Sequence, residues 1–129
     1  MITRKKITLI LRWSVRIRWT TENAASIPQQ AGVYVLVTKH ADDKYYRDYV
    51  GQSSDLRERF LGHLAPSEPN ACIRRKLQHE VAYFRYALLA SQNDRLDAEQ
   101  ALYDLYSPTC NAGRPPGSGR GYDVELDER

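Results

Sequence analysis

Two runs of β-forming residues, separated only by the four polar residues ADDK, constrain this chain more than any other feature. The first run is GVYVLVTKH at residues 32–40, and the second is YYRDYVG at residues 45–51. Strands joined by so short a polar link pair as an antiparallel hairpin. Alternation along the first strand puts Tyr34 on the face opposite Val33. The same rule predicts one shared face in the second run for Tyr45, Arg47 and Tyr49.

The segments around the hairpin predict further strands and helices. RWSVRIRW at residues 12–19 alternates strictly between arginine or serine and apolar residues, which predicts a half-buried strand. After the hairpin, Ser53 or Ser54 is expected to cap a helix that runs to about Leu64. The remaining expected elements are a helix at 71–80, a strand at 81–89 and a helix at 96–106.

This order of elements predicts an α+β fold class, with a small antiparallel β-sheet flanked by helices. Three core strands are expected, with an extra strand from the N-terminal region. The chain has 129 residues, of which 42% are hydrophobic and 27% charged, as in an ordinary globular domain. The expected regions are a basic N-terminal strand and linker at 1–31, a central domain at 32–112 and a flexible tail at 113–129.

Charge is distributed unevenly along the chain. The net charge of +3 permits a polyanionic partner without requiring one. Basic residues crowd the first twenty positions, where either a soluble surface or phosphate contact explains them. They are Arg4, Lys5, Lys6, Arg12, Arg16 and Arg18.

Cysteine use and hydropathy predict a cytoplasmic protein with no membrane partner. Cys72 and Cys110 lack the spacing of zinc ligands, and two cysteines without a secretory leader are typical of a reducing compartment. The apolar run near the start ends at Arg12, which makes it too short for a signal sequence. No apolar stretch approaches the length that spans a membrane.

Arg59 and His63 stand one helical turn apart in YVGQSSDLRERFLGH, residues 49–63, and so share a helix face. Leu56 and Phe60 adjoin that face and turn it toward the body of the protein. Two interpretations are open. Arg59 is either a partly buried cation satisfied by a core carboxylate, beside a structural His63, or a cation directed at a ligand.

Glu99 is the candidate carboxylate, because it lies in mid-helix among apolar neighbours. A single carboxylate near tyrosines and an arginine suits one Mg²⁺ ion that keeps most of its waters and takes further oxygens from a phosphate. The alternative is a glutamate on a solvated helix surface, where most glutamates lie.

Several short motifs occur in a fixed order. GVY at 32–34 is followed by YVG at 49–51, and Arg59 stands eight residues after Gly51. Further along, EQALYDLYSPTCN brings three more matched positions, Glu99, Pro108 and Asn111. Together these residues resemble the GIY-YIG nuclease family over residues 32–111, and His63 is also a frequent position in that family. Gln52 stands where many relatives carry lysine or serine.

This resemblance implies a metal-dependent DNA endonuclease that hydrolyses phosphodiester bonds with one Mg²⁺ or Mn²⁺ ion, held by Glu99. It also implies Tyr34 as the general base and Arg59 as the group that grips the phosphate. Tyr49 and His63 would hydrogen-bond the water or the phosphate. Asn111 would fix the glutamate helix against the sheet or reach the phosphate. The implied substrate-positioning residues are Gly51, Gln52 and Asn111.

DNA is therefore the expected partner. The arginines on one face of the N-terminal strand are expected to contact its phosphates without sequence preference, namely Arg12, Arg16 and Arg18. No zinc finger or helix-turn-helix pattern flanks the domain, so a targeting partner protein or a homodimer through the Trp13–Trp19 strand both stay open. The alternative function is a non-catalytic nucleic-acid-binding module of the same fold.

Overall fold

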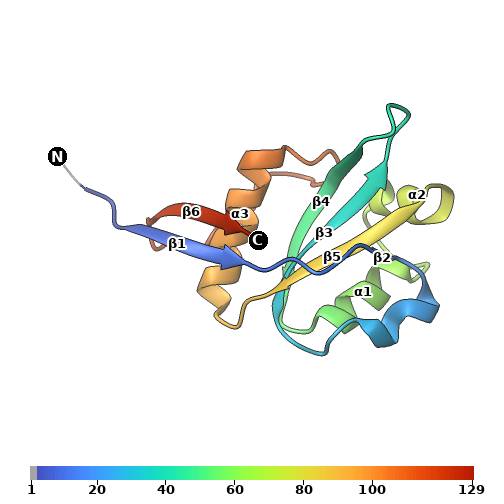
Figure 1. Ribbon diagram of the computed structural model, residues 1–129, viewed down its shortest axis with the longest axis horizontal. Coiled ribbons are helices and arrows are strands. Elements are labelled where there is room, and N and C mark those ends of the chain that lie inside the picture. The colour runs from blue at the N-terminus through green and yellow to red at the C-terminus, as the bar shows by residue number, and fades with distance from the viewer. Residues whose placement is uncertain (1–2) are drawn as a thin grey trace.

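The computed structural model describes residues 3–129 and has an α+β architecture, as expected (Figure 1). Its elements in chain order are β1 (Lys6–Leu11), β2 (Ile17–Arg18), the 3₁₀ helix η1 (Thr21–Ser26), β3 (Gly32–Lys39), β4 (Tyr45–Ser53), α1 (Leu56–Leu64), α2 (Ala71–His79), β5 (Ala82–Leu88), α3 (Gln92–Tyr106) and β6 (Asp123–Glu128). Across residues 3–129, no helix has the length and apolar character needed to cross a membrane.

The central sheet is antiparallel and has the strand order β2-β5-β3-β4. Strand β3 therefore lies inside the sheet, paired with β4 on one side and β5 on the other, which confirms the predicted hairpin. Helices α1 and α2 pack on one face of this sheet. Helix α3 and the pair formed by β1 and β6 cover the other face (Figure 1).

Side chains of β3 contribute to both cores because they alternate between the two faces. Tyr34 and Leu36 pack with Phe60 of α1 in the first core. Val33 and Val35 pack with apolar residues of α3 and β1 in the second. The face that carries Tyr34, next to α1, is the one on which the predicted site residues must meet.

Strand β4 carries a bulge that changes which side chains share a face. Tyr49 and Arg47 pair with successive residues of β3, which leaves Asp48 as the extra residue. The prediction that Tyr45, Arg47 and Tyr49 share one face is therefore wrong. Tyr49 packs in the core of Tyr34, whereas the Arg47 guanidinium stacks on the opposite side of the sheet. One inserted residue is enough to reverse the facing of everything beyond it.

The strand predicted at 12–19 is only partly present. Ile17–Arg18 pairs with β5, which supplies the expected N-terminal strand of the central sheet. The residues before it are irregular, and Val15 is 78% exposed. The backbone N–H of Ser14 donates to the carbonyl of Tyr86, so this segment follows the sheet edge without forming a ladder.

Residues 113–129 were expected as a flexible tail, and the structure shows that they contain strand β6. It pairs in parallel with β1, with Lys6 opposite Asp123 and Leu11 opposite Glu128. Its apolar side chains pack partly against the second core. Glu128 also accepts a hydrogen bond from the indole N–H of Trp13. The acidic end of the chain is thus fastened to the basic beginning.

Two helix starts differ from the prediction. Asp55, not either of the preceding serines, caps α1, because its side chain accepts a hydrogen bond from the backbone N–H of Glu58. Ser91 caps α3, which begins at Gln92, earlier than the apolar pattern indicated.

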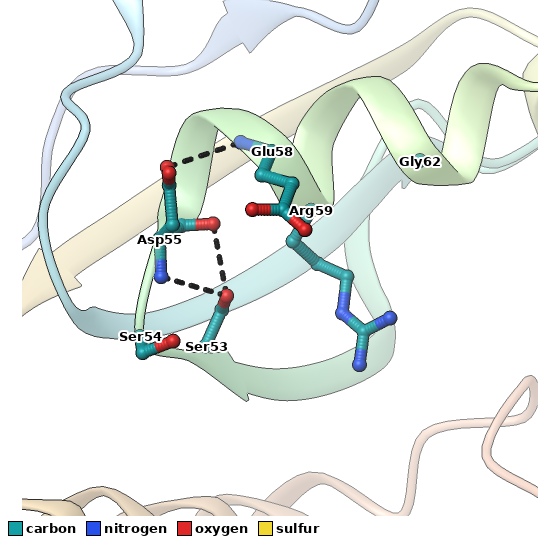
Figure 2. A pocket seen from close by; sticks show the side chains of 6 residues that line it. All are labelled: Ser53, Ser54, Asp55, Glu58, Arg59 and Gly62. Carbon is teal, nitrogen blue, oxygen red and sulfur yellow. Dashed lines mark hydrogen bonds between the residues drawn. The ribbon is translucent and has the colours of Figure 1, made fainter.

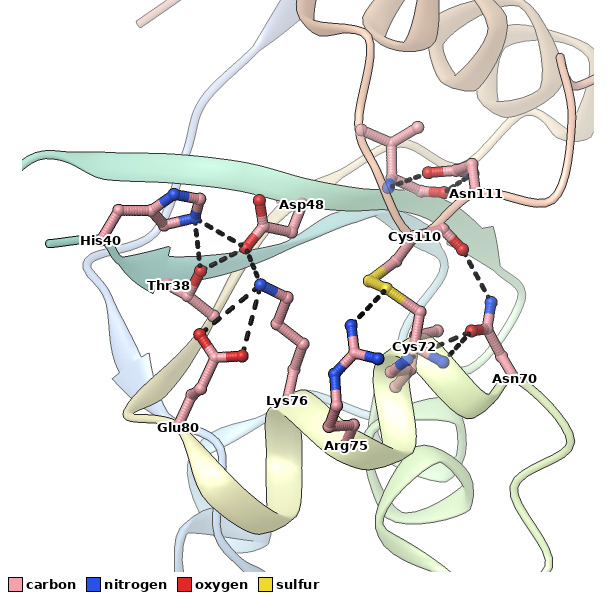
Figure 3. The surroundings of a disulfide bond; sticks show 12 residues. Thr38, His40, Asp48, Asn70, Cys72, Arg75, Lys76, Glu80, Cys110 and Asn111 are labelled. Atoms are coloured by element: carbon pink, nitrogen blue, oxygen red, sulfur yellow. Dashed lines mark hydrogen bonds and ion pairs between the residues drawn. A yellow bond between two sulfur atoms is a disulfide. The ribbon is translucent and has the colours of Figure 1, made fainter.

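Cys72 and Cys110 form a disulfide, which differs from the free thiols expected for a reducing compartment. Their Cα atoms are 5.3 Å apart, although 38 residues separate them along the chain. The bond joins the first turn of α2 to the segment after α3 (Figure 3). Asn70 strengthens this junction, because its side chain caps α2 and donates to the carbonyl of Cys110.

Candidate active site

Tyr34 and Tyr49 lie side by side on the α1 face of the sheet, with ring centroids 6.1 Å apart. Tyr34, on the interior strand, is 1% exposed, whereas Tyr49, on the edge strand, is partly exposed. Burial and the neighbouring Tyr49 raise the pKa of Tyr34 well above its ordinary value. Burial and the charge of Glu99 raise the pKa of Tyr49. Both phenols therefore hold their protons at neutral pH in the structure as it stands.

Gly51 makes room for the Tyr34 ring. The two residues are paired across β3 and β4, and a Cβ atom at position 51 would lie 2.5 Å from the Tyr34 hydroxyl oxygen. Real Cβ atoms do not approach other atoms so closely, so a side chain here would displace the ring. The glycine of the YVG motif thus positions the tyrosine of the GVY motif.

His63 joins the tyrosines from the last turn of α1, where it is 5% exposed. Its Nε2 lies 2.7 Å from the Tyr34 hydroxyl, and its Nδ1 lies 2.8 Å from a carboxylate oxygen of Glu68. Both ring nitrogens are therefore engaged within the protein, so the expected hydrogen bond from His63 to the water or phosphate is not available. Burial, with the Arg59 charge acting in the same direction, lowers the pKa of His63.

Glu68 was not among the expected site residues. It lies in APSEPN, which the sequence marked only as a break between helices, and it is 7% exposed. A buried carboxylate in such a loop is unusual. The one signal in the sequence is its position five residues after His63, which is too weak to identify it without the fold.

Arg59 is exposed and lines a polar pocket at the start of α1, together with Ser53, Ser54, Asp55, Glu58 and Gly62 (Figure 2). No hydrogen bond joins its guanidinium to these neighbours (Figure 2). No carboxylate within residues 3–129 forms an ion pair with it. The interpretation of Arg59 as a buried cation satisfied by a core carboxylate is therefore wrong.

Glu99 reaches the same site from α3. Burial raises its pKa to about 7, against the opposing effects of Arg59 and the backbone N–H of Gln52. The Arg59 charge also acts on the pKa of both Tyr34 and Tyr49. These four side chains, from β3, β4, α1 and α3, thus lie within electrostatic reach of one another. Glu99 is a partly desolvated carboxylate and not a solvated surface glutamate.

Of the two carboxylates beside the tyrosines and His63, Glu68 is held by His63 and Asn70, which leaves Glu99 as the candidate metal ligand. Within the described part of the chain, no three His, Cys, Asp or Glu side chains gather in a way that could chelate a cation. Such a donor set does not fit zinc, which takes three or four protein ligands. It fits Mg²⁺ or Mn²⁺, which keep several waters and bind through one or two carboxylates and the phosphate of a substrate.

The side chains of Gln52 and Asn111 are bound to the protein. The side-chain oxygen Oε1 of Gln52 accepts a hydrogen bond from Arg95 Nε, at 3.1 Å. The Asn111 amide bonds both the N–H and the C=O of Val50, each at 3.0 Å. Of its two expected roles, these contacts correspond to fixing the segment after α3 against the sheet.

Arg95 is a second residue that sequence reasoning missed. It is 6% exposed, and it stands one turn before Glu99 on α3. Besides Gln52, its guanidinium donates to the carbonyls of Leu89 and Ala90. Arg95 therefore holds the start of α3 against the end of β5 and the edge of β4.

The N-terminal arginines do not join this site. Ile17 packs in the Tyr34 core, so its neighbours Arg16 and Arg18 lie on the other face of the sheet. There the Arg16 guanidinium lies 3.8 Å from the centroid of the Tyr45 ring. The hydrogen bond from Arg129 is the main cause of the lowered pKa of Asp127, and the charge of Arg12 acts in the same direction. Phosphate contact by these arginines stays a prediction.

No family model matches the chain, and no curated protein matches its sequence. Solved structures do match its fold. The magnesium-bound GIY-YIG N-terminal endonuclease domain of UvrC from Thermotoga maritima has a TM-score of 0.57 and 20% sequence identity, over 70% of this chain and 93% of that one.

Two point-mutant forms of the same Thermotoga maritima domain, each bound to its catalytic divalent cation, agree with this match. One has a TM-score of 0.58 at 18% identity, and the other a TM-score of 0.56 at 20% identity. Both cover 71% of this chain and 93% of the matched one. At such identities the likeness concerns the fold. The chain therefore has the fold of the GIY-YIG endonuclease domain, as its GVY and YVG motifs implied.

Proposed function

We propose that this chain is a metal-dependent endonuclease that hydrolyses phosphodiester bonds in DNA. One observation carries the proposal. Arg59, which has no ion-pair partner among residues 3–129, and Glu99, a partly desolvated carboxylate, come from different helices to the same pair of tyrosines. Burial of an ionised carboxylate such as that of Glu99 reduces stability, and groups perturbed in this way cluster at functional sites.

Glu99 would hold one Mg²⁺ or Mn²⁺ ion, whose other ligands are waters and a phosphate oxygen. When bound, the cation supplies positive charge to the phosphate and to the leaving oxygen. The magnesium bound by the UvrC domain of the same fold supports this choice of metal. Burial raises the pKa of Glu99 to about 7 because it removes solvation from the charged carboxylate. A bound cation would stabilise that charged form in place of the lost solvation.

Arg59 is the proposed phosphate ligand. Its planar guanidinium donates two parallel hydrogen bonds to a phosphate, and these strengthen as negative charge develops in the transition state. Because no carboxylate among residues 3–129 forms an ion pair with Arg59, its fork is available to the substrate.

Tyr34 is the proposed general base, and Tyr49 connects it to the attacking water. Tyr34 is 1% exposed, but Tyr49 is partly exposed and lies beside it, with ring centroids 6.1 Å apart. A proton from the water therefore passes along the two phenols. The oxygen of the water bonds to phosphorus, the bond from phosphorus to the leaving oxygen breaks, and the leaving oxygen takes a proton from solvent.

A non-catalytic nucleic-acid-binding module is the second candidate function. The raised pKa of Tyr34 favours it, because a phenol that keeps its proton cannot act as a base. Cleavage by the endonuclease therefore needs an acceptor for the Tyr34 proton inside the protein.

Incubation of the purified protein with nicked, flapped, branched and plain duplex DNA tests the proposal. We expect cleavage of at least one substrate with Mg²⁺ or Mn²⁺, loss of cleavage in EDTA, and recovery when the metal is returned. Cleavage that persists in EDTA would contradict the role of Glu99. Binding of DNA without cleavage under every condition would support the binding module instead.

A further inference from the structure

Glu68 is held more tightly than a loop carboxylate needs to be. One carboxylate oxygen lies 2.8 Å from Nδ1 of His63, and the other accepts the backbone N–H of Asn70 at 3.0 Å. Its own carbonyl accepts a hydrogen bond from Arg74 of α2 at 2.7 Å. Both carboxylate oxygens and the backbone are thus fixed, at a side chain that is 7% exposed.

This arrangement determines which nitrogen of His63 carries hydrogen. A carboxylate only accepts hydrogen bonds, so Nδ1 of a neutral His63 must be the donor to Glu68. Nε2 then has a free lone pair, and it lies 2.7 Å from the Tyr34 hydroxyl. The phenol can only donate to that nitrogen. A carboxylate, an imidazole and a hydroxyl in this order form the geometry by which hydrolytic triads remove a proton from a hydroxyl.

We propose that Glu68 is a positioning residue that makes His63 the acceptor of the Tyr34 proton. This inference rests on the proposed nuclease function. The proton moves from the Tyr34 oxygen to His63 Nε2, which creates a phenolate beside an imidazolium. The phenolate then regains a proton from the attacking water through Tyr49. The imidazolium returns its proton to solvent after cleavage, so every group ends as it began.

Four charged or titratable groups face His63. Tyr34 comes from β3, Tyr49 from β4, Arg59 from α1 itself, and Glu68 from the loop before α2. Of these, Arg59 opposes protonation of the imidazole, and Glu68 favours it. The positive charge that His63 gains in the transfer is therefore stabilised by Glu68.

Glu68→Gln tests the proposal with little change in side-chain shape. The Asn70 N–H can only donate, so the amide oxygen of glutamine must face it. The amide NH₂ then faces His63 Nδ1 and donates to it. This moves the imidazole hydrogen to Nε2, and the Tyr34 hydroxyl loses its acceptor. Glu80→Gln, just beyond the other end of α2, is the matched control.

The first readout needs neither metal nor substrate. In full-length protein with ¹⁵N-labelled histidine, NMR should show hydrogen on Nδ1 of His63 in the wild type and in Glu80→Gln, and on Nε2 in Glu68→Gln. Hydrogen on Nε2 in the wild type would overturn the proposal, even if the variant does not fold. An unchanged tautomer in folded Glu68→Gln would overturn it as well.

The second readout is cleavage. Loss of a positioned proton acceptor lowers the rate by about a hundredfold or more, so Glu68→Gln should fall by this amount and Glu80→Gln should not. The acidic limb of the pH–rate profile should also move to lower pH in Glu68→Gln, because Glu68 raises the pKa of His63. A wild-type rate and profile would overturn the proposal. If the wild type cleaves nothing, the proposed function fails, while the NMR result still decides whether Glu68 sets the tautomer.

Discussion

The hydroxyl of Tyr34 lies 2.7 Å from Nε2 of His63. This contact joins the interior strand of the sheet to the helix that covers it, and it occupies a phenol that burial would otherwise leave unpaired. Tyr34 also lies beside Tyr49, and the charge of Glu99 acts on its pKa. Substitutions that displace the Tyr34 ring should therefore reduce the cleavage rate more than they reduce stability.

Gly51→Ala should displace the Tyr34 ring. The new methyl group would lie 2.5 Å from the hydroxyl oxygen, and overpacking of this kind destabilises a protein by about 1–3 kcal/mol. We expect cleavage to fall by about a hundredfold or more because the hydrogen bond to His63 is lost. Single-turnover rates and thermal melting measure the two effects. Gly113→Ala is the control, since a methyl group there meets nothing within 4 Å. Equal rates for the two variants would contradict the positioning role of Gly51.

Glu99→Gln should change the pH dependence of stability in EDTA. Burial raises the pKa of Glu99 to about 7 from 4.5, so between these values the folded protein binds more protons than the unfolded chain. The contribution of Glu99 to stability is therefore present at low pH and is lost as the pH rises through about 7.

Differential scanning calorimetry in EDTA checks this sign. The melting temperature of Glu99→Gln minus that of the wild type should be larger near neutral pH than near about pH 5. Addition of Mg²⁺ at neutral pH should raise the melting temperature of the wild type and leave that of Glu99→Gln unchanged. A wild-type response to Mg²⁺ in the variant would show that the ion binds elsewhere.

Reduction of the Cys72–Cys110 disulfide should destabilise the fold. A cross-link that closes a loop of 38 residues contributes roughly 2–4 kcal/mol, chiefly by restricting the unfolded chain. Thermal melting with and without a reductant should show a decrease of roughly 10 °C. The Cys72→Ser, Cys110→Ser double variant should melt near the reduced wild type and should not respond to the reductant. Equal melting of oxidised and reduced protein would exclude a stabilising bond.

Alanine at Arg12, Arg16 and Arg18 tests the expected phosphate contacts. If all three contact phosphates, the slope of log affinity against log salt should become shallower by up to about three units. The place of Arg16 and Arg18 on the sheet face opposite Tyr34 requires DNA to extend around the sheet edge. Fluorescence anisotropy across a salt series measures the slope. An unchanged slope would assign these arginines to solubility.

Most of the fold could be predicted because its signals are local. The hairpin of β3 and β4 follows from β-branched runs around a short polar link, and β5 follows from its own run of β-forming residues. The parallel pairing of β1 with β6 could not be predicted, because it joins the two ends of the chain, and opposite charge on two distant segments does not predict that they pair as strands. The disulfide was missed for a similar reason, since its cysteines meet only after α2 and α3 have packed.

Most of the proposed catalytic residues could be named, but their orientation could not. Tyr34, Arg59 and Glu99 stand in recognisable motifs, and the fold brings them within electrostatic reach of one another. The bulge at Asp48 turns Tyr49 toward Tyr34. It could not be predicted, because the rule that strand residues alternate between faces assumes a regular strand. Glu68 contributes through a loop whose path depends on the packing of α1 against α2.

Arg59→Ala provides the most direct test of the central claim, that an unpaired guanidinium stabilises the transition state of phosphodiester cleavage. Arg59 has no ion-pair partner among residues 3–129, so we expect the melting temperature to stay at the wild-type value. Single-turnover cleavage with Mg²⁺ should fall by about a hundred- to a thousand-fold, and Arg59→Lys should not restore it, because an ammonium group lacks the planar fork. A folded Arg59→Ala protein that cleaves DNA at the wild-type rate would contradict the account.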